Sequence, residues 1–171
     1  TDVGANTVTL TVTDENGLMS TCTATVNVAD NTAPTAICQD ISVNLDASGQ
    51  AGITAADIDN GSTDACGIQT LSLSETIFNC SDTGDQTVTL TVTDVNGNRS
   101  TCDATITISD VTAPTAICQD ISINLDASGQ ASITAEQVNN GSSDNCGKAS
   151  LSLSETDFDC TDVGTPSVVL T

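Results

Sequence analysis

Hydrophobic and polar residues alternate with a period of two along most of this chain. In the run TVTLTVTD, valine and leucine occupy every second position and threonine fills the others. Such alternation predicts a strand with one buried face. The pair Asn16-Gly17, typical of tight hairpin turns, separates this run from a second one, STCTATVNV. We therefore expect a β-hairpin over residues 1–30, and residues 86–110 repeat the same pattern.

Between these hairpins, the pattern predicts further short strands at residues 37–45, 50–54, 68–74 and 76–80. A polar loop rich in Asp, Asn and Gly covers residues 55–67, and no segment has a helical period over three turns. Short strands at such spacing, with turn residues between them, are typical of an all-β sandwich. In a seven-strand sandwich of the Ig-like or fibronectin III-like kind, the first and last strands run parallel.

The same letters recur at a fixed distance of 80 residues. The segment TAPTAICQDIS occupies 32–42 and again 112–122, and all the cysteines keep the same offset. A period of this size predicts a tandem array of modules. Residues 1–32 match the C-terminal part of a preceding Ig-like module, 33–112 form a complete one, and 113–171 match the N-terminal part of a following one. We therefore expect this sequence to be one part, or window, of a longer tandem array.

The junction between modules is the short stretch from Asp30 to Pro34. Proline fixes its own φ and favours an extended conformation at Ala33. A linker this short, without a Gly or Ser run, restricts the orientation of successive modules.

Charge excludes several classes of partner. The net charge is −21, with 23 acidic residues against only Arg99 and Lys148. Binding of nucleic acid requires Lys and Arg to neutralise phosphates, so we expect none. An anionic membrane surface is excluded for the same reason, and no apolar run predicts membrane insertion.

Disulfides are expected to compensate for the small hydrophobic core of each module. The chain lacks His, Trp and Tyr, and its only aromatic residues are Phe78 and Phe158. Small modules of this kind need covalent or metal cross-links. Four cysteines in each period predict disulfides and an oxidising, extracellular compartment.

Four cysteines permit three pairings, and the expected strand order selects among them. Cys38 and Cys102 start the two parallel strands, whereas Cys66 and Cys80 flank one predicted hairpin, as do Cys146 and Cys160. We predict these three disulfides. Cys22 and Cys118 then pair outside the window. Cys38 has the opposite parity to the apolar face of its strand, so a β-bulge is expected near it.

Three motifs together carry a resemblance to a known family: DNTAPTAICQDISVNLDASG, DNGSTDACG and VTLTVTDVNGN followed by STC. They resemble the tandem hyalin-repeat-like (HYR-like), Ig-like modules of large secreted surface proteins of the Bacteroidetes type. The resemblance covers the whole chain. It implies an Ig-like fold at the cell surface, and a role as spacer, stalk or adhesive arm.

Acidic side chains gather at one pole of the expected sandwich. Oxygen ligands from a loop, a turn and a linker are what Ca²⁺ requires, and its binding would stiffen the junction. Asp, Asn and Gly are also good turn residues, so turn chemistry is the alternative. The candidate calcium ligands are Asp30, Asp57, Asp59, Asn60, Asp64, Asp94, Asn96, Asp110 and Asp144.

The sequence also bears on glycosylation and on catalysis. Asn60 and Asn140 lie in N-x-S triplets of the polar loop and are candidate glycan acceptors, although such triplets also occur by chance. No nucleophile motif, His or positioned Lys is present, so we predict no catalytic residues and no enzyme.

The predicted function is structural: an extracellular filament or adhesin stalk in which each repeat contacts its neighbours in the same chain or fibre. One alternative is an adhesive module that binds glycan or protein, and another is a spacer of a secreted enzyme. Strand exchange between chains would also suit the two partial modules. However, residues 1–11 and 161–171 would compete for one slot, which argues against exchange.

Overall fold

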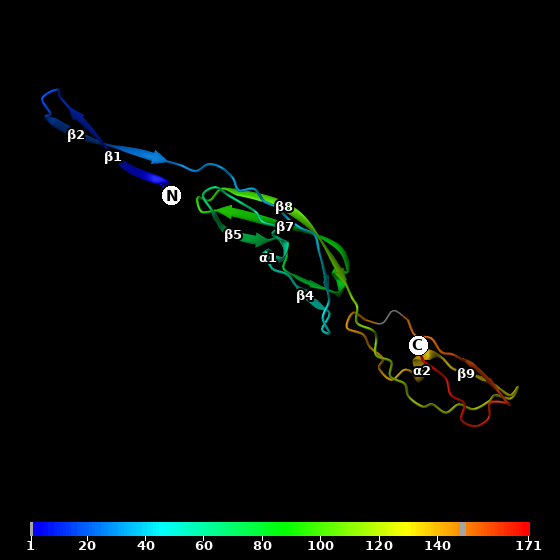
Figure 1. The fold of residues 1–171 in the computed structure, drawn as a ribbon. Coiled ribbons are helices and arrows are strands. Elements are labelled where there is room, and N and C mark those ends of the chain that lie inside the picture. Colours follow the sequence, from blue (N-terminus) through cyan, green and yellow to red (C-terminus); the bar gives the residue numbers. More distant parts are fainter. Residues whose placement is uncertain (1, 148–149) are drawn as a thin grey trace. The chain divides into compact units, whose positions relative to one another are not determined.

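The computed structural model describes residues 2–147 and 150–171, and these are folded mainly as β-strands (Figure 1). The chain forms two compact units. One comprises the described residues up to Ser42, together with Gly52–Thr76 and Asp85–Thr107. The other comprises Val43–Ala51, Ile77–Gly84 and the described residues from Ile108 onward. Below, residues 33–112 are called the central segment and residues 113–171 the C-terminal segment.

The predicted N-terminal hairpin is present. Strands β1 (Gly4–Thr13) and β2 (Met19–Val28) pair antiparallel, with Leu10 opposite Cys22. Their turn is closed by Asp14, whose Oδ1 accepts hydrogen bonds from two backbone N–H groups. Nearly every residue of both strands is exposed, and Leu10 keeps 61% of its surface.

The central segment builds a four-stranded sheet in the order β3-β8-β7-β5. Its strands are β3 (Ile41–Asn44), β5 (Ile68–Leu73), β7 (Gly84–Asp94) and β8 (Arg99–Ser109). The alternation predicted from sequence puts the apolar residues of β7 and β8 inside. Six side chains on these two strands are at most 2% exposed, namely Val88, Leu90, Val92, Ala104, Ile106 and Ile108.

Strands β3 and β8 run in the same direction, as expected. Cys38 is bonded to Cys102, Asp40 Oδ1 accepts from Thr105 N, and Leu45 N donates to Ser109 O. The two strands therefore advance together. Cys38 lies before β3 begins and forms an isolated bridge to Asp59. The alternation of side chains along β3 therefore does not decide which way Cys38 points, and the expected β-bulge near it is not needed.

One predicted hairpin is wrong. β4 (Gln50–Gly52) pairs with β6 (Ile77–Asn79), whereas β5 pairs antiparallel with β7. The predicted strands at 68–74 and 76–80 therefore belong to different sheets. A short 3₁₀ helix, η1 (Cys80–Asp82), follows β6.

Two helical turns lie inside the polar loops and were not predicted. They are α1 (Ala55–Ile58) and α2 (Ala135–Val138). Asp57 Oδ2 accepts hydrogen bonds from both the backbone N–H and the hydroxyl of Thr54, which caps the first turn. The spacing Thr-x-x-Asp was the available sequence signal. The described part of the chain has no helix both long and apolar enough to span a membrane.

The C-terminal segment has little regular structure. β9 (Gln130–Ser132) pairs with β10 (Asp157–Asp159). Leu153 forms a bridge to Leu170, with backbone hydrogen bonds on either side of it, and further bridges join Thr115 to Ser143 and Cys118 to Asn139. Its small core consists of Ile133, Val138 and Phe158, with Leu153 and Val168 packed against it.

Candidate functional site

Two disulfides form among the described residues. Cys38 and Cys102 have Cα atoms 5.9 Å apart, which confirms the predicted pair. Cys80 is bonded to Cys146, with a Cα–Cα distance of 5.2 Å. The predicted pairs Cys66–Cys80 and Cys146–Cys160 are therefore wrong. Cys80 and Cys146 lie 66 residues apart in sequence, one in the central segment and the other in the C-terminal segment.

The cause of this error is the sheet arrangement. Cys66 precedes β5, while Cys80 follows β6, and these two strands have different partners. A hairpin that would bring the two thiols together does not exist. Four cysteines of the described chain remain unbonded: Cys22, Cys66, Cys118 and Cys160.

Polar contacts surround the Cys80–Cys146 disulfide. Asp144 Oδ2 accepts a hydrogen bond from Cys146 N at 2.9 Å, which fixes the backbone at the bonded cysteine. The Asn145 amide donates to Asp46 O at 2.9 Å and to Asp110 Oδ1 at 3.2 Å. We call Asp46, Cys80, Asp110, Asn145 and Cys146 the disulfide junction. In it, the loop before residue 147 is bonded covalently to Cys80, which follows β6. One hydrogen bond each joins the same loop to Asp46 in the turn after β3 and to Asp110 after β8.

Gly49 allows the close approach of Cys80. A Cβ atom at Gly49 would lie 2.6 Å from Cys80 Sγ and 3.1 Å from Asn145 O, and its φ is +73°. From the sequence, Asp46–Gly49 is only a turn between the predicted strands 37–45 and 50–54. The motif Asp-x-Ser-Gly-Gln, present at 46–50 and 126–130, was the signal that this turn has a repeated role.

Replacing Gly49 with alanine is expected to lower the equilibrium constant for forming Cys80–Cys146 by roughly fivefold or more, because overpacking costs about 1–3 kcal/mol. Gly61→Ala is the matched control. Its φ is +86°, but nothing lies within 4 Å of a Cβ there, so it adds only backbone strain. Thiol labelling and mass spectrometry in a thiol–disulfide buffer measure the bonded fraction. Equal fractions in the two variants would contradict the packing role.

A second polar cluster lies beside the hairpin turn after β7. Asp30 Oδ2 accepts from the Asn96 amide at 2.9 Å, and Asp30 O accepts from the Asn98 amide at 3.2 Å. Asp64 Oδ1 accepts from Cys66 N at 2.7 Å. We call Asp30, Asp64, Cys66, Asn96 and Asn98 the thiol junction.

The thiol junction keeps Cys66 protonated. A hydrogen bond from the Cys66 thiol to Asp30 raises the pKa of Cys66, and burial and the charges of Asp30, Asp64 and Asp94 raise it further. The pKa of Asp30 is lowered, first by the Thr32 N–H and then by the thiol. Because the thiolate is the nucleophile and the metal ligand, this arrangement does not activate Cys66 for catalysis or metal binding.

The structure brings together only some of the candidate calcium ligands. One ligand atom each from Asp30, Asp64 and Cys66 lies within 4.8 Å of the others, and Asn96 bonds to Asp30. The other candidates serve turns elsewhere. Asp57 caps α1, Asp59 accepts from Ser62, and Asp94 accepts from Asn96 and Asn98. Asp110 belongs to the disulfide junction, Asp144 accepts from Cys146 N, and the Asn60 N–H donates to Ile37 O.

The donor set of the thiol junction does not fit Ca²⁺. Calcium takes six to eight oxygen ligands, whereas this cluster contains a thiol, and its two carboxylates already accept N–H donors. The hydrogen bonds favour turn chemistry, and the calcium site stays a prediction.

We expect the unfolding temperature to be the same in millimolar calcium chloride and in EDTA, because the oxygen set is incomplete. Scanning calorimetry in the two buffers measures this. A rise in calcium that disappears in Asp30→Asn would instead establish the site.

Acid is expected to weaken the fold through the Asp46 turn. Hydrogen bonds from the Ser48 hydroxyl, Gln50 N and Ser48 N hold the pKa of Asp46 below its ordinary value of 3.8. The folded state therefore prefers the carboxylate. This stability is complete above 3.8 and is lost as the pH falls through the lowered pKa.

Urea unfolding at a series of pH values checks this, with Asp46→Asn as the comparison. The variant should lose less stability than the wild type between neutral pH and the region below 3.8. Protonation also relieves repulsion in a chain of net charge −21, so the difference between the two proteins is the informative quantity. Parallel curves would contradict the prediction.

The candidate glycan acceptors Asn60 and Asn140 are both exposed. Their exposure is compatible with decoration, and glycosylation stays a prediction.

A scan against models of known protein families finds no match for this chain, and a search of curated proteins finds no relative. The resemblance to HYR-like modules therefore stays an expectation from the motifs.

Proposed function

We propose that this chain is a non-catalytic structural component of an extracellular filament or adhesin stalk. The observation that carries the proposal is the Cys80–Cys146 disulfide. Its two cysteines occupy different copies of the sequence pattern that recurs after 80 residues. A covalent bond between consecutive copies is suited to carrying load from one copy to the next.

In this proposal, the recurring unit is an 80-residue Ig-like sandwich module. One complete module covers residues 33–112 and parts of two others cover 1–32 and 113–171. Support comes from the sheet β3-β8-β7-β5, the separate pair β4-β6, and the parallel course of β3 and β8. A parallel first and last strand lets the chain enter and leave a sandwich at opposite ends.

The junction chemistry supports a restrained connection. Asn145 bonds to both Asp46 and Asp110, so the C-terminal segment is tied to the central segment beside the disulfide as well as through it. Disulfides persist in oxidising compartments, which supports an extracellular location at the cell surface.

Small-angle scattering from a dilute sample tests the proposal. Strand β7 has 11 residues and is about 36 Å long at roughly 3.3 Å per residue. Two modules of that length end to end have a radius of gyration above about 20 Å, whereas a compact globule of 171 residues has about 15.5 Å. A value near the globular one would overturn the stalk proposal.

A further inference from the structure

Several asparagines of the chain are followed directly by glycine, and this pair is chemically reactive. The backbone nitrogen of the glycine attacks the side-chain carbonyl of the asparagine, and the missing Cβ leaves the approach unobstructed. The product is a five-membered succinimide ring. Asn16 and Asn96 lie in the hairpin turns after β1 and β7, whereas Asn60 and Asn140 lie in the polar loops after α1 and α2.

The hairpin turns hold their glycines back from this reaction. Gly17 N donates to Asp14 O at 3.1 Å, and Gly97 N donates to Asp94 O at 3.3 Å. The side-chain amide of Asn96 is also held, because it donates to a carboxylate oxygen at 2.9 Å. A glycine nitrogen that is bonded to a carbonyl has to give up that hydrogen bond before it attacks.

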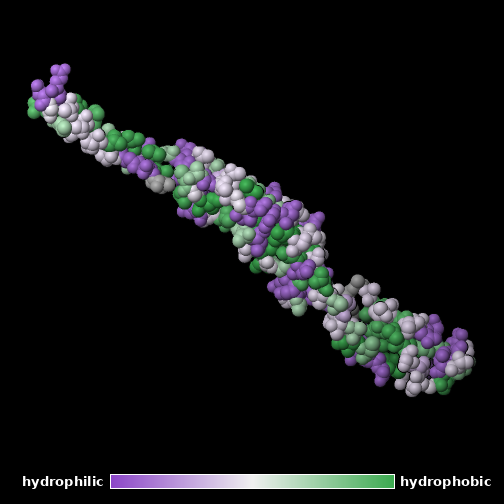
Figure 2. Space-filling model, in the orientation of Figure 1, coloured by the Kyte–Doolittle hydropathy of each residue, from purple (hydrophilic) through white to green (hydrophobic). Residues whose placement is uncertain are grey.

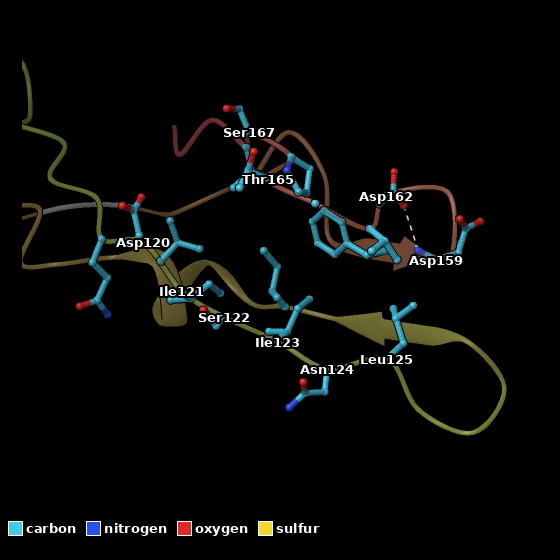
Figure 3. A pocket seen from close by; sticks show the side chains of 18 of the residues that line it. Asp120, Ile121, Ser122, Ile123, Asn124, Leu125, Asp159, Asp162, Thr165 and Ser167 are labelled. Carbon is cyan, nitrogen blue, oxygen red and sulfur yellow. Dashed lines mark hydrogen bonds between the residues drawn. The ribbon is translucent and has the colours of Figure 1, made fainter.

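The polar loops leave the reactive pair open. Asn60 and Asn140 are exposed, and among the described residues no backbone carbonyl accepts a hydrogen bond from the N–H of Gly61 or Gly141. A Cβ atom at either glycine would have nothing within 4 Å. Figure 3 shows the pocket of the C-terminal segment, which is lined in part by residues 121–125 and does not include Asn140 or Gly141. Solvent therefore reaches both loops.

The two loops have matching backbones. In the first, Asn60 N donates to Ile37 O at 2.9 Å, and Ser62 Oγ accepts from Ile37 N at 3.0 Å. In the second, the residues 80 positions further on make the same two bonds to Ile117 at 2.8 and 2.9 Å. The glycines agree as well, with φ values of +86° and +90°. A difference in reactivity between the loops must therefore come from the side chains that differ.

The residue before each asparagine is one that differs. Asp59 in the first loop is replaced by the neutral Asn139 in the second. Each accepts a hydrogen bond from the backbone N–H three residues later, at 3.0 and 2.9 Å, so the exchange preserves the local fold. The pKa of Asp59 is lowered, first by the Ser62 hydroxyl and then by the N–H groups of Ser62 and Gly61. Asp59 is therefore a carboxylate at neutral pH, and it lies against the nitrogen that would attack.

A carboxylate in this place slows the reaction. The attacking species is the glycine nitrogen after it has lost its proton to hydroxide, and its negative charge is repelled by the carboxylate. The hydrogen bond to the carboxylate also favours the protonated N–H. Two like charges about 4 Å apart repel one another enough, even in water, to lower a rate constant about fivefold. The neutral side chain of Asn139 imposes no such repulsion.

We infer that the pair at 140–141 forms a succinimide spontaneously, and that Asp59 protects the matching pair at 60–61. This inference goes beyond the proposed structural function and does not depend on it. In the step, a bond forms between Gly141 N and Asn140 Cγ, and the bond between Cγ and the side-chain nitrogen breaks. Hydroxide takes the proton of the Gly141 N–H, and the side-chain nitrogen gains a proton from water and leaves as ammonia.

Water then opens the ring by one of two routes. Hydrolysis at Cγ gives an aspartate, whereas hydrolysis at the backbone carbonyl gives an isoaspartate, in which the main chain runs through the side chain. Either product removes the amide of the candidate glycan acceptor Asn140. It also adds a negative charge to a chain of net charge −21, on whose surface hydrophilic residues are spread over every part (Figure 2).

The isoaspartate would also disturb the hydrogen bonds of the loop. It inserts one methylene group into the main chain between residues 140 and 141. The Asn140 N–H and the Ser142 hydroxyl lie on opposite sides of this insertion, and both are bonded to Ile117. We expect at least one of the two bonds to lengthen, with faster hydrogen exchange at the Ile117 amide.

Incubation of residues 1–171 in heavy-oxygen water at mildly alkaline pH, followed by digestion and mass spectrometry, tests the inference. Ring opening leaves one heavy oxygen in the product, which marks each asparagine that has reacted. We expect Asn140 to react first, Asn60 to react at least about fivefold more slowly, and both hairpin asparagines to react more slowly than Asn140. Faster reaction at a hairpin asparagine would overturn the site. Equal rates at Asn60 and Asn140 would overturn the protection by Asp59.

Two reciprocal substitutions isolate the effect of the charge. Asp59→Asn should raise the rate at Asn60 to that at Asn140, and Asn139→Asp should lower the rate at Asn140 about fivefold. Each variant gives one loop a residue that the other loop already contains, so both variants should fold. Unchanged rates in both would overturn the role of the carboxylate.

Unfolding the chain in urea with a reductant separates structure from local sequence. The hydrogen bonds of the hairpin turns are then lost, so Asn16 and Asn96 should approach the rate of Asn140. If the hairpin asparagines stayed as slow as in the folded chain, the protection assigned to the turns would be overturned.

Discussion

Replacing Leu90 with alanine is expected to reduce the free energy of unfolding by about 2.5–5 kcal/mol. Leu90 is fully buried in β7, as are Val88 and Val92 of the same strand, so truncation leaves a cavity in the core. A small module with few large side chains has little surplus stability, so this loss is enough to unfold much of the population. Urea or guanidinium unfolding followed by circular dichroism measures it.

Leu10→Ala is the matched control, because Leu10 has the same sequence neighbours but is 61% exposed. At concentrations where the chain is monomeric, it should change stability by less than about 0.5 kcal/mol. If both variants lost the same stability, the burial of β7 and the exposure of β1 would not describe the molecule in solution.

Changing both Cys38 and Cys102 to serine is expected to cost about 4 kcal/mol, the loop-entropy value for a closure of this length. The two cysteines are separated by 64 residues, and their disulfide fastens the start of β8 next to the segment that leads into β3. Without the disulfide, the conformational entropy of the unfolded chain increases, whereas the folded sheet gains no stabilising contact. Thermal and denaturant unfolding of the double variant measure the loss.

Cys22→Ser is the control for this pair, since Cys22 is exposed and forms no disulfide in the described chain. It should leave the stability of the monomer unchanged. A double variant as stable as wild type would mean that the sheet contacts alone hold β3 beside β8.

The strands with the clearest alternation could be predicted from the sequence. In TVTLTVTD, Val and Leu lie on one face of the strand and Thr on the other. Both copies of this run form strands, β1 and β7, and each is followed by the expected turn. Cys38–Cys102 could also be predicted, because it requires only that the first and last strands run parallel. These features depend on local pattern or on a general rule of topology.

The partner of Cys80 could not be predicted, because it depends on which sheet β6 joins. Nothing in the letters around residues 68–80 distinguishes a β5–β6 hairpin from a pairing of β6 with β4. The alternation likewise predicts that Leu10 and Leu90 each lie on the apolar face of a strand. It does not predict which other residues pack against that face. The acidic residues were misleading for a related reason, since Asp57 and Asp59 satisfy backbone groups in their own loop.

The two disulfides overlap along the chain, which changes how it would respond to pulling. Cys38 is bonded to Cys102 and Cys80 to Cys146, so the shortest covalent route from residue 38 to 146 runs through only the 22 peptide steps between Cys80 and Cys102. At about 3.5 Å per residue, that route extends to about 90 Å, disulfides included, whereas the reduced chain would extend to about 380 Å. Most of the residues between these cysteines are therefore shielded from tension until a disulfide breaks, and reducing agent should lengthen the unfolding step in a single-molecule force trace at least about fourfold.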